Sequence, residues 1–303
     1  MYDIIIAGAG TAGLSASIYA VRAGKTALVI EAAAYGGQII NTPDIENYPG
    51  IAHISGFDFA TGLYEQAKGL GAEFAFEKVV SIEDTGEGKL VTTDQGSYTA
   101  KAVILATGAK NRPLGLPNEK ELIGKGVSYC ATCDGMFFRN KDVCVNGGGN
   151  TALEDAQFLA NYCRKVYVVH RRDAFRADEK EVSRLRDKAN VEFVLNSEVA
   201  GLKADEHGLT AVAVRNRITG EERDLPVSGL FVAIGQAPDN AAFANVVRLD
   251  SKGYVEAGES CRTETPGIFT AGDCRTKTVR QLTTAASDGA VAALAACSYI
   301  DSL

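Results

Sequence analysis

Two cysteines separated by two residues carry the most reactive chemistry in the sequence. Cys130-Ala131-Thr132-Cys133 follows Gly126-Val127-Ser128-Tyr129. Cysteines at this spacing can close a small reversible disulfide ring, and one thiolate is stabilised beside a helix N-terminus or a charge. Half of a zinc site is the alternative, but no second C-x-x-C and no nearby histidine pair supplies the other ligands. The spacing therefore favours a redox pair and no metal.

A glycine-rich loop near the start of the chain points to a nucleotide. The apolar strand 4–7 leads into Gly8-Ala9-Gly10-Thr11-Ala12-Gly13, helical spacing follows over 14–20, and a strand over 26–30 ends at Glu31. Glycines let the backbone approach a pyrophosphate at a helix N-terminus, and the acid accepts from ribose hydroxyls. A loop that needs glycine only for its shape is the alternative. Because strand, loop, helix and acid occur together, we expect a dinucleotide site.

The same unit recurs 139 residues later. A strand over 142–146 leads into Gly147-Gly148-Gly149-Asn150-Thr151-Ala152, followed by a helical stretch over 153–160 and a strand over 165–169. Gly147, Gly149 and Ala152 register with the three glycines of the first loop without a gap. The sequence therefore predicts two nucleotide sites.

The two units differ at the end of their second strand. The position of Glu31 is taken by His170, and Arg171, Arg172 and Arg176 follow it. A carboxylate would repel a 2′-phosphate, whereas guanidinium groups bind one through charge-assisted hydrogen bonds. The second site is therefore expected to take NADPH rather than NADH. A solvated run of charges is the alternative here, and it is the interpretation that we favour for the charged stretch 178–186.

Composition limits the class of protein. The chain has 303 residues, 46% of them apolar, and a net charge of −7, so a domain count of about two is expected and nucleic acid is disfavoured. There is no apolar run of the roughly 18 residues that a membrane helix needs, and the first residues lack the basic region of a signal peptide. We expect a cytoplasmic protein whose other five cysteines are ordinary thiols, with Cys144 buried in a strand.

Two loops, over 110–117 and 235–240, follow strand-like runs and bracket the second unit. The roughly 60 residues that remain carry no nucleotide motif and are too few for a core of their own. We therefore expect an α/β protein with two Rossmann-like, three-layer ββα domains. The inserted domain spans 113–241, and the discontinuous domain spans 1–112 and 242–303.

Several short motifs occur in the order seen in one enzyme family. They are Gly8 to Gly13, Gly36-Gly37-Gln38, Asn47-Tyr48-Pro49-Gly50, Ala106-Thr107-Gly108, Cys130-Ala131-Thr132-Cys133-Asp134-Gly135, His170-Arg171-Arg172 with Arg176, Ala271-Gly272-Asp273 and Arg280-Gln281. Over essentially its whole length the chain resembles the bacterial low-molecular-weight thioredoxin reductases, which belong to the pyridine nucleotide-disulfide oxidoreductases. The resemblance implies FAD in the discontinuous domain, NADPH in the inserted one, a homodimer, and thioredoxin as the disulfide substrate.

The resemblance also assigns roles to single residues. For FAD it implies the pyrophosphate loop (Gly8, Gly10, Thr11, Ala12, Gly13), the adenosine ribose (Glu31), the middle of the molecule (Gly37, Gln38, Asn47), the adenine (backbone of Val79), a further segment (Ala106, Thr107, Gly108), the ribityl chain (Asp273) and the flavin pyrimidine (Arg280, Gln281, Leu282). For NADPH it implies Gly147, Gly149, Asn150, Thr151, His170, Arg171, Arg172 and Arg176.

The hypothesis for the reaction is a hydride transfer from NADPH to FAD followed by reduction of the disulfide. By resemblance, Cys133 faces the flavin, Cys130 attacks the thioredoxin disulfide, and Asp134 is the acid that handles the thiol proton. Dithiol and nicotinamide belong to the same domain and cannot both face the flavin, so the two linkers must act as hinges.

Three alternatives stay open. The first is a flavoprotein of the same fold that reduces a glutaredoxin-like protein or a peroxiredoxin. The second is a flavoprotein fed by ferredoxin, against which the basic cluster argues. The third is a redox sensor without turnover. The chain also departs from the commonest family pattern at Asn150-Thr151, at Cys274-Arg275 and at Val279.

Overall fold

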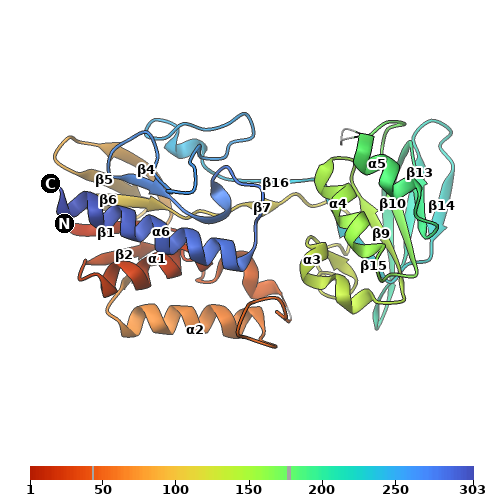
Figure 1. The fold of residues 1–303 in the computed structure, drawn as a ribbon, viewed down its shortest axis with the longest axis horizontal. Coiled ribbons are helices and arrows are strands. Elements are labelled where there is room, and N and C mark those ends of the chain that lie inside the picture. The colour runs from red at the N-terminus through yellow and green to blue at the C-terminus, as the bar shows by residue number, and fades with distance from the viewer. Residues whose placement is uncertain (43, 176–178) are drawn as a thin grey trace. The chain divides into compact units, whose positions relative to one another are not determined.

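The structure is a computed structural model that describes residues 1–42, 44–175 and 179–303. The chain forms two compact units (Figure 1). Unit 1 comprises Met1–Lys110 and Ala237–Leu303, and unit 2 comprises Asn111–Gln236. Unit 2 is therefore an insertion in unit 1, and the chain crosses between them twice.

Unit 1 is built on a seven-stranded sheet in the order β3-β2-β1-β6-β5-β4, with β17 also paired to β6. The pairs among β1, β2, β3, β6 and β17 are parallel, whereas β4 and β5 form an antiparallel extension. The nine residues of β6 change neighbour, since 97–100 pair with β5 and 103–105 pair with β17. The strands are β1 (Tyr2–Ala7), β2 (Ala27–Ile30), β3 (Glu73–Ala75), β4 (Val79–Asp84), β5 (Lys89–Thr93), β6 (Ser97–Leu105) and β17 (Ile268–Thr270).

Both faces of this sheet are buried, which explains why residues 4–7 of β1 are all apolar. Ile4 and Ile6 belong to one hydrophobic cluster, and Ile5 and Ala7 belong to another on the opposite face. Successive side chains of a strand point to opposite faces, so a central parallel strand needs apolar residues at both parities. The carboxyl end of β1 then delivers the first glycine loop to the edge of the sheet.

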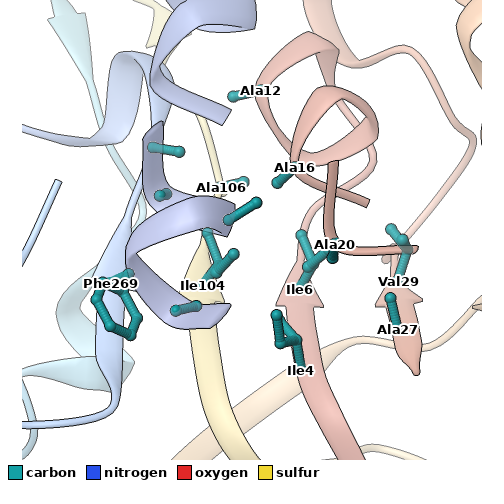
Figure 2. Close-up of a cluster of buried hydrophobic side chains, with 14 of the residues drawn as sticks. Ile4, Ile6, Ala12, Ala16, Ala20, Ala27, Val29, Ile104, Ala106 and Phe269 are labelled. Atoms are coloured by element: carbon teal, nitrogen blue, oxygen red, sulfur yellow. The ribbon is translucent and has the colours of Figure 1, made fainter. Parts of the chain in front are cut away.

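Helices α1 (Thr11–Arg22) and α6 (Leu282–Asp301) pack on one face of the sheet. Ala12, Ala16 and Ala20 recur every four residues along α1, so they share one helix face, and all three lie in the cluster around β1 and β6 (Figure 2). Their small side chains allow α6 to come close. At the closest point, a Cβ added to Gly289 of α6 would lie 2.2 Å from the carbonyl oxygen of Ala12.

The other elements of unit 1 are short except for one helix. That helix, α2, begins after Ser55, whose hydroxyl accepts a hydrogen bond from the backbone N–H of Asp58. The bounds are η1 (Gly37–Asn41), α2 (Gly56–Gly69), η3 (Ala241–Phe243) and η4 (Gly272–Cys274).

Unit 2 repeats the plan on a five-stranded, all-parallel sheet in the order β11-β10-β9-β15-β8. The predicted strands 142–146 and 165–169 are confirmed as β9 and β10, and the predicted helix between them is α4. The bounds are β8 (Val127–Ser128), α3 (Ala131–Asp134), η2 (Gly135–Phe138), β9 (Asp142–Asn146), α4 (Asn150–Leu159), β10 (Lys165–Val169), α5 (Glu179–Arg186), β11 (Val191–Val194) and β15 (Gly229–Val232).

Two features of unit 2 go beyond the sequence-based expectations. Most of the charged stretch 178–186 forms helix α5, which buries Val182 and Leu185 and leaves its charged side chains outward. A three-stranded antiparallel sheet, β12 (Ser197–Asp205), β13 (Gly208–Asn216) and β14 (Glu222–Leu225), adds to the parallel one. With two Rossmann-like units and parallel sheets, the predicted α/β fold class is confirmed.

The two chain crossings lie side by side. Strands β7 (Lys110–Asn111) and β16 (Gln236–Ala237) form a small two-stranded sheet. The backbone N–H of Arg112 donates to the carbonyl of Gly235 (3.0 Å), and the Gln236 side chain donates to the Asn111 side chain (2.8 Å). The insertion therefore leaves and returns to unit 1 through neighbouring strands.

Candidate active site

Cys130 and Cys133 are joined by a disulfide, with their Cα atoms 5.3 Å apart. Cys130 is the residue that precedes the short helix α3, and Cys133 lies within it, so the turn of the helix brings the two sulfurs together. Both residues are half-buried. The other five cysteines are all buried and free, which confirms the prediction for Cys144. The reversible bond expected from the spacing is thus present in the fold.

Asp134 follows the disulfide directly. The hydroxyl of Ser128 donates to Oδ2 of Asp134 at 2.6 Å, whereas Oδ1 is buried with no hydrogen-bond partner among the described residues. Burial raises the pKa of Asp134, and the Ser128 hydrogen bond offsets part of that rise. The same hydroxyl accepts the backbone N–H of Cys130 at 3.0 Å. Ser128, which sequence reasoning missed, therefore links the carboxyl group to the disulfide.

The first glycine loop has the tight geometry that its sequence predicts. Gly8 has φ +112°, and a Cβ there would lie 2.3 Å from the carbonyl oxygen of Ala106, the residue that follows the neighbouring strand β6. A Cβ on Gly13 would lie 1.8 Å from the carbonyl of Gly8. At Gly10, by contrast, a Cβ would meet nothing within 4 Å. The loop is thus closed on its protein side and open at the N-terminus of α1.

Several predicted residues of unit 1 converge on this loop. A Cβ on Gly37 would lie 3.4 Å from the Cα of Gly10, and one on Gly272 would lie 2.8 Å from the Cβ of Ala12. Glu31 accepts the backbone N–H groups of Ala9 (2.8 Å) and Ala33 (3.1 Å). Segments from four parts of the sequence therefore meet at the amino end of α1.

The remaining predicted residues of unit 1 lie as follows. Thr11 is buried in the first turn of α1, Gln38 donates to the carbonyl of Ala109 (3.3 Å), Asn47 donates to Gln281 (3.3 Å), Thr107 donates to the side-chain oxygen of Asn240 (2.7 Å), Gly108 has φ +67°, and Val79 opens β4.

Asp273 lies in η4, and its Oδ1 is buried without a hydrogen-bond partner among the described residues. Burial raises its pKa, against a lowering influence of Lys277 and Arg280. Arg280 donates to the backbone carbonyl of Asp273 (3.3 Å) and stacks over the ring of Tyr254 at 4.2 Å. Leu282 begins α6, and Gln281 before it forms a capping box with Thr284. An unsatisfied carboxyl thus lies close in sequence to a long helix N-terminus.

The second loop repeats the first. A Cβ on Gly147 would lie 2.4 Å from the carbonyl of Ala233, just as Gly8 meets Ala106, and a Cβ on Gly149 would meet nothing within 4 Å, just as at Gly10. Asn150 and Thr151 are exposed in the first turn of α4. Unit 2 therefore offers a second open helix N-terminus.

The predicted basic cluster separates into buried and exposed parts. The His170 ring is 7% exposed, packs on the backbone of Gly148, stacks on Phe175 and contacts the carbonyl of Ala174 through Nε2 (3.0 Å). Arg171 and Arg172 are exposed. Arg176 lies outside the described residues. Arg171 and Arg172 thus follow the carboxyl end of β10 and are exposed to solvent, whereas the buried His170 ring packs against the second glycine loop.

The described residues were also compared with the requirements of a metal site and of a membrane-spanning helix. Asp44, Glu46 and His53 have ligand atoms within 4.8 Å of one another on the surface of unit 1, and this trio includes neither Cys130 nor Cys133. In the described parts of the chain, no helix has the length and apolarity to cross a membrane.

Comparison with known proteins agrees with this geometry. The model of the pyridine nucleotide-disulphide oxidoreductases matches residues 2–289. A thioredoxin reductase from Listeria monocytogenes is 42% identical over 100% of this chain and 95% of its own length, and one from Treponema pallidum is 45% identical over 100% and 98%. The crystal structure of the thioredoxin reductase from Streptococcus pyogenes superposes with a TM-score of 0.96 at 42% identity, covering 100% of this chain and 99% of that one. The chain therefore belongs to the pyridine nucleotide-disulphide oxidoreductase family.

Proposed function

We propose that the protein is a thioredoxin-disulfide reductase that takes hydride from NADPH through FAD to the Cys130–Cys133 disulfide. The observation that carries the proposal is this disulfide at the start of α3, directly followed by the buried carboxyl group of Asp134. Membership in the family, together with the two thioredoxin reductases that are 42% and 45% identical to this chain, supports the choice of substrate.

The residues of unit 1 fit FAD. The open N-terminus of α1 at Gly10 offers backbone N–H groups and a positive dipole end to a pyrophosphate. The unpartnered Oδ1 of Asp273 is an acceptor that a ribityl hydroxyl would satisfy. The N-terminus of α6, at Leu282, would stabilise the negative charge that develops on the pyrimidine side of a reduced flavin.

Unit 2 fits NADPH in the same way. The N-terminus of α4 beyond Gly149 is open, and Arg171 and Arg172 lie exposed at the end of the next strand. A double Arg171→Gln, Arg172→Gln variant is expected to raise the KM for NADPH by at least roughly 100-fold, because each of the two lost charge-assisted bonds costs on the order of 1.5–3 kcal/mol. The KM for NADH should stay unchanged, and an equal rise for both nucleotides would contradict this assignment.

The cysteines then carry out thiol–disulfide exchange. The thiolate of Cys130 attacks the substrate disulfide, forms a mixed disulfide and expels one substrate thiolate. The thiolate of Cys133 attacks the Cys130 sulfur of that mixed disulfide, expels the second substrate thiolate and restores the internal disulfide. Bound FAD supplies the hydride chemistry that reduces the internal disulfide again.

Asp134 is the acid that handles the thiol proton in this proposal. Its raised pKa keeps the carboxyl protonated to higher pH than an exposed aspartate, so it can give a proton to a leaving thiolate. Ser128 orients it, because the hydroxyl holds Oδ2 while Oδ1 stays available. The dithiol and the NADPH site belong to one unit, so turnover would require the crossings at β7 and β16 to act as hinges.

The proposal extends to the environment of the enzyme. We infer a homodimer in the cytoplasm, with thioredoxin as the partner and without nucleic acid or membrane. The five free buried cysteines support a reducing compartment, and the net charge of −7 disfavours nucleic acid as a partner.

The test is anaerobic turnover. NADPH should bleach the yellow absorbance of the FAD-loaded enzyme, and oxidised thioredoxin should restore it. Cys133→Ser should still bleach with NADPH but should lose reduction of thioredoxin almost completely. Bleaching without reoxidation by thioredoxin, but with reoxidation by a glutaredoxin-like protein or a peroxiredoxin, would favour the alternative substrates. Reduction by ferredoxin and not by NADPH would favour the ferredoxin-fed alternative, and absence of any turnover would favour a sensor.

A further inference from the structure

A buried ionic cluster around Asp288 in α6 has no role in the chemistry described above. Arg275 binds both carboxylate oxygens of Asp288, through Nε and Nη2 at 2.9 Å each. The Nζ of Lys277 donates to Oδ2 at 2.8 Å, and so does the backbone N–H of Gly272 at 2.9 Å. The side chains of Asp288, Arg275 and Lys277 are 8%, 2% and 6% exposed. One carboxylate thus accepts four hydrogen bonds from residues 272–277, that is, from η4 and the residues that follow it.

The cluster joins three parts of unit 1 that the proposed function assigns to FAD. Through the N–H of Gly272 it holds the turn that presents Asp273. Asp288 itself lies six residues after Leu282, which is about 9 Å from the start of α6. The next residue, Gly289, is the point where α6 touches the first turn of α1. The ribityl, pyrimidine and pyrophosphate positions are therefore set relative to one another by this carboxylate.

The cluster also carries spare positive charge. Two buried cations face one buried carboxylate. Among the described residues, the one other acid that forms an ion pair with them is Glu259, which is 95% exposed and 3.4 Å from Arg275. A buried charge is costly unless it is paired. A negatively charged ligand beside the cluster would supply the missing counter-charge.

We propose that Asp288 is a positioning residue for the flavin and that Lys277, held by Asp288, supplies positive charge that favours the reduced, anionic flavin. The inference rests on the proposed binding of FAD in unit 1. Asp288 anchors the Gly272–Asp273 turn against α6, so its loss loosens the ribityl contact. Lys277 needs no contact with the flavin, since at an effective dielectric constant near 20 a unit charge changes an equilibrium roughly tenfold even from a distance of about 10 Å.

The experiment measures FAD affinity and flavin midpoint potential on the full chain. Asp288→Asn is expected to raise the Kd for FAD about tenfold or more and, in the protein that retains FAD, to shift the flavin equilibrium toward the reduced form. Lys277→Gln is expected to shift the flavin equilibrium about tenfold toward the oxidised form, which lowers the two-electron midpoint potential by about 30 mV. A purely structural role would not move the potentials in opposite directions.

Asp3→Asn is the matched control. Asp3 is also paired with a lysine in unit 1, Lys101 at 2.7 Å, but it lies at the amino end of β1, away from the glycine loop. It should leave both the Kd and the potential unchanged. If Asp288→Asn does not fold, the potential of Lys277→Gln decides alone.

Two results would overturn the inference while FAD binding stands. They are a wild-type Kd in a folded Asp288→Asn protein and an unmoved potential in Lys277→Gln. Failure of the wild-type chain to bind FAD would overturn the proposed function itself, and the inference with it.

Discussion

At the scale of the residue, the environment of each carboxyl group determines its chemistry. Asp134, Asp155, Asp273 and Asp288 are all removed from water to a large extent, but they have different partners. Asp288 is surrounded by cations and its pKa is lowered despite burial, whereas Asp134 and Asp273 each keep one unsatisfied oxygen and a raised pKa. The pKa is therefore lowered in one of the four groups, Asp288, and raised in the other three.

The first prediction concerns Ser128. Its hydrogen bond favours the ionised form of Asp134, so Ser128→Ala should raise the pKa of Asp134 further. If Asp134 acts as the acid, activity falls as pH rises through that pKa, and the alkaline limb of the kcat profile should move to higher pH. Ser128→Thr keeps the hydroxyl and should keep the wild-type profile. Identical profiles for all three proteins would mean that the limb belongs to another group.

The second prediction concerns Asp155 on α4, whose pKa burial raises to about 7, with a smaller contribution from Glu154. The folded state holds this proton up to about pH 7, whereas the unfolded chain releases it near 3.8. Because the folded state binds more protons than the unfolded state between these pH values, the stability of the wild type falls as pH rises through them. The free energy of unfolding of Asp155→Asn, relative to that of the wild type, should therefore be higher at pH 8 than at pH 4 by on the order of 1–3 kcal/mol. Urea denaturation at both pH values measures this, with Glu65→Gln, an exposed acid on α2, as control.

At the scale of the element, the close packing of α6 on α1 can be tested with two glycines. Gly289→Ala places a Cβ 2.2 Å from the carbonyl of Ala12, so the helices must separate, and we expect a loss of about 1–3 kcal/mol. Gly62→Ala in α2 meets nothing within 4 Å and should stabilise by about 0.5–1 kcal/mol. Chemical denaturation of the FAD-free proteins measures both. Equal effects of the two substitutions would show that α6 does not limit this packing.

The elements also show what could be predicted from the sequence. The two strand–loop–helix–strand units were predictable because buried parallel strands are apolar at every position and glycine loops have few substitutes. Strands β12, β13 and β14 were missed because they are half-exposed and mix charged with apolar residues, for example in Ser197–Asp205. Helix α5 was hidden by its charges, since only Val182 and Leu185 turn inward.

The same limit applies within the candidate site. Cys130 and Cys133 are recognisable because their spacing is local. Asp288 and Arg275 lie 13 residues apart on different elements, and no local pattern marks their pairing. Ser128 and Asp134 are six residues apart, but one ends β8 and the other ends α3, and no local pattern marks their hydrogen bond. Contacts between residues that only tertiary packing brings together could not be predicted from the sequence and became visible in the structure.

At the scale of the whole molecule, each unit has hydrophobic clusters of its own. Residues 111–236, expressed alone, should therefore fold cooperatively and bind NADPH with an affinity within a few-fold of the full chain. Residues 1–110 and 237–303, joined by a short glycine-serine linker, should bind FAD, because β7 and β16 bring the two ends together. Calorimetry and nucleotide titration test both halves. An unfolded 111–236 fragment would show that its core needs unit 1.

The double pairing of β6 has a consequence for synthesis on the ribosome. Unit 2 has all of its strands once residue 232 has emerged, whereas the sheet of unit 1 still lacks β17, at residues 268–270, and α1 still lacks its cover, α6. Domains usually fold in the order in which they are made. In this chain, unit 1 is the first to be synthesised in part and the last to be completed. The apolar alanine face of α1 therefore stays exposed through most of translation, and a chaperone would bind the nascent chain there.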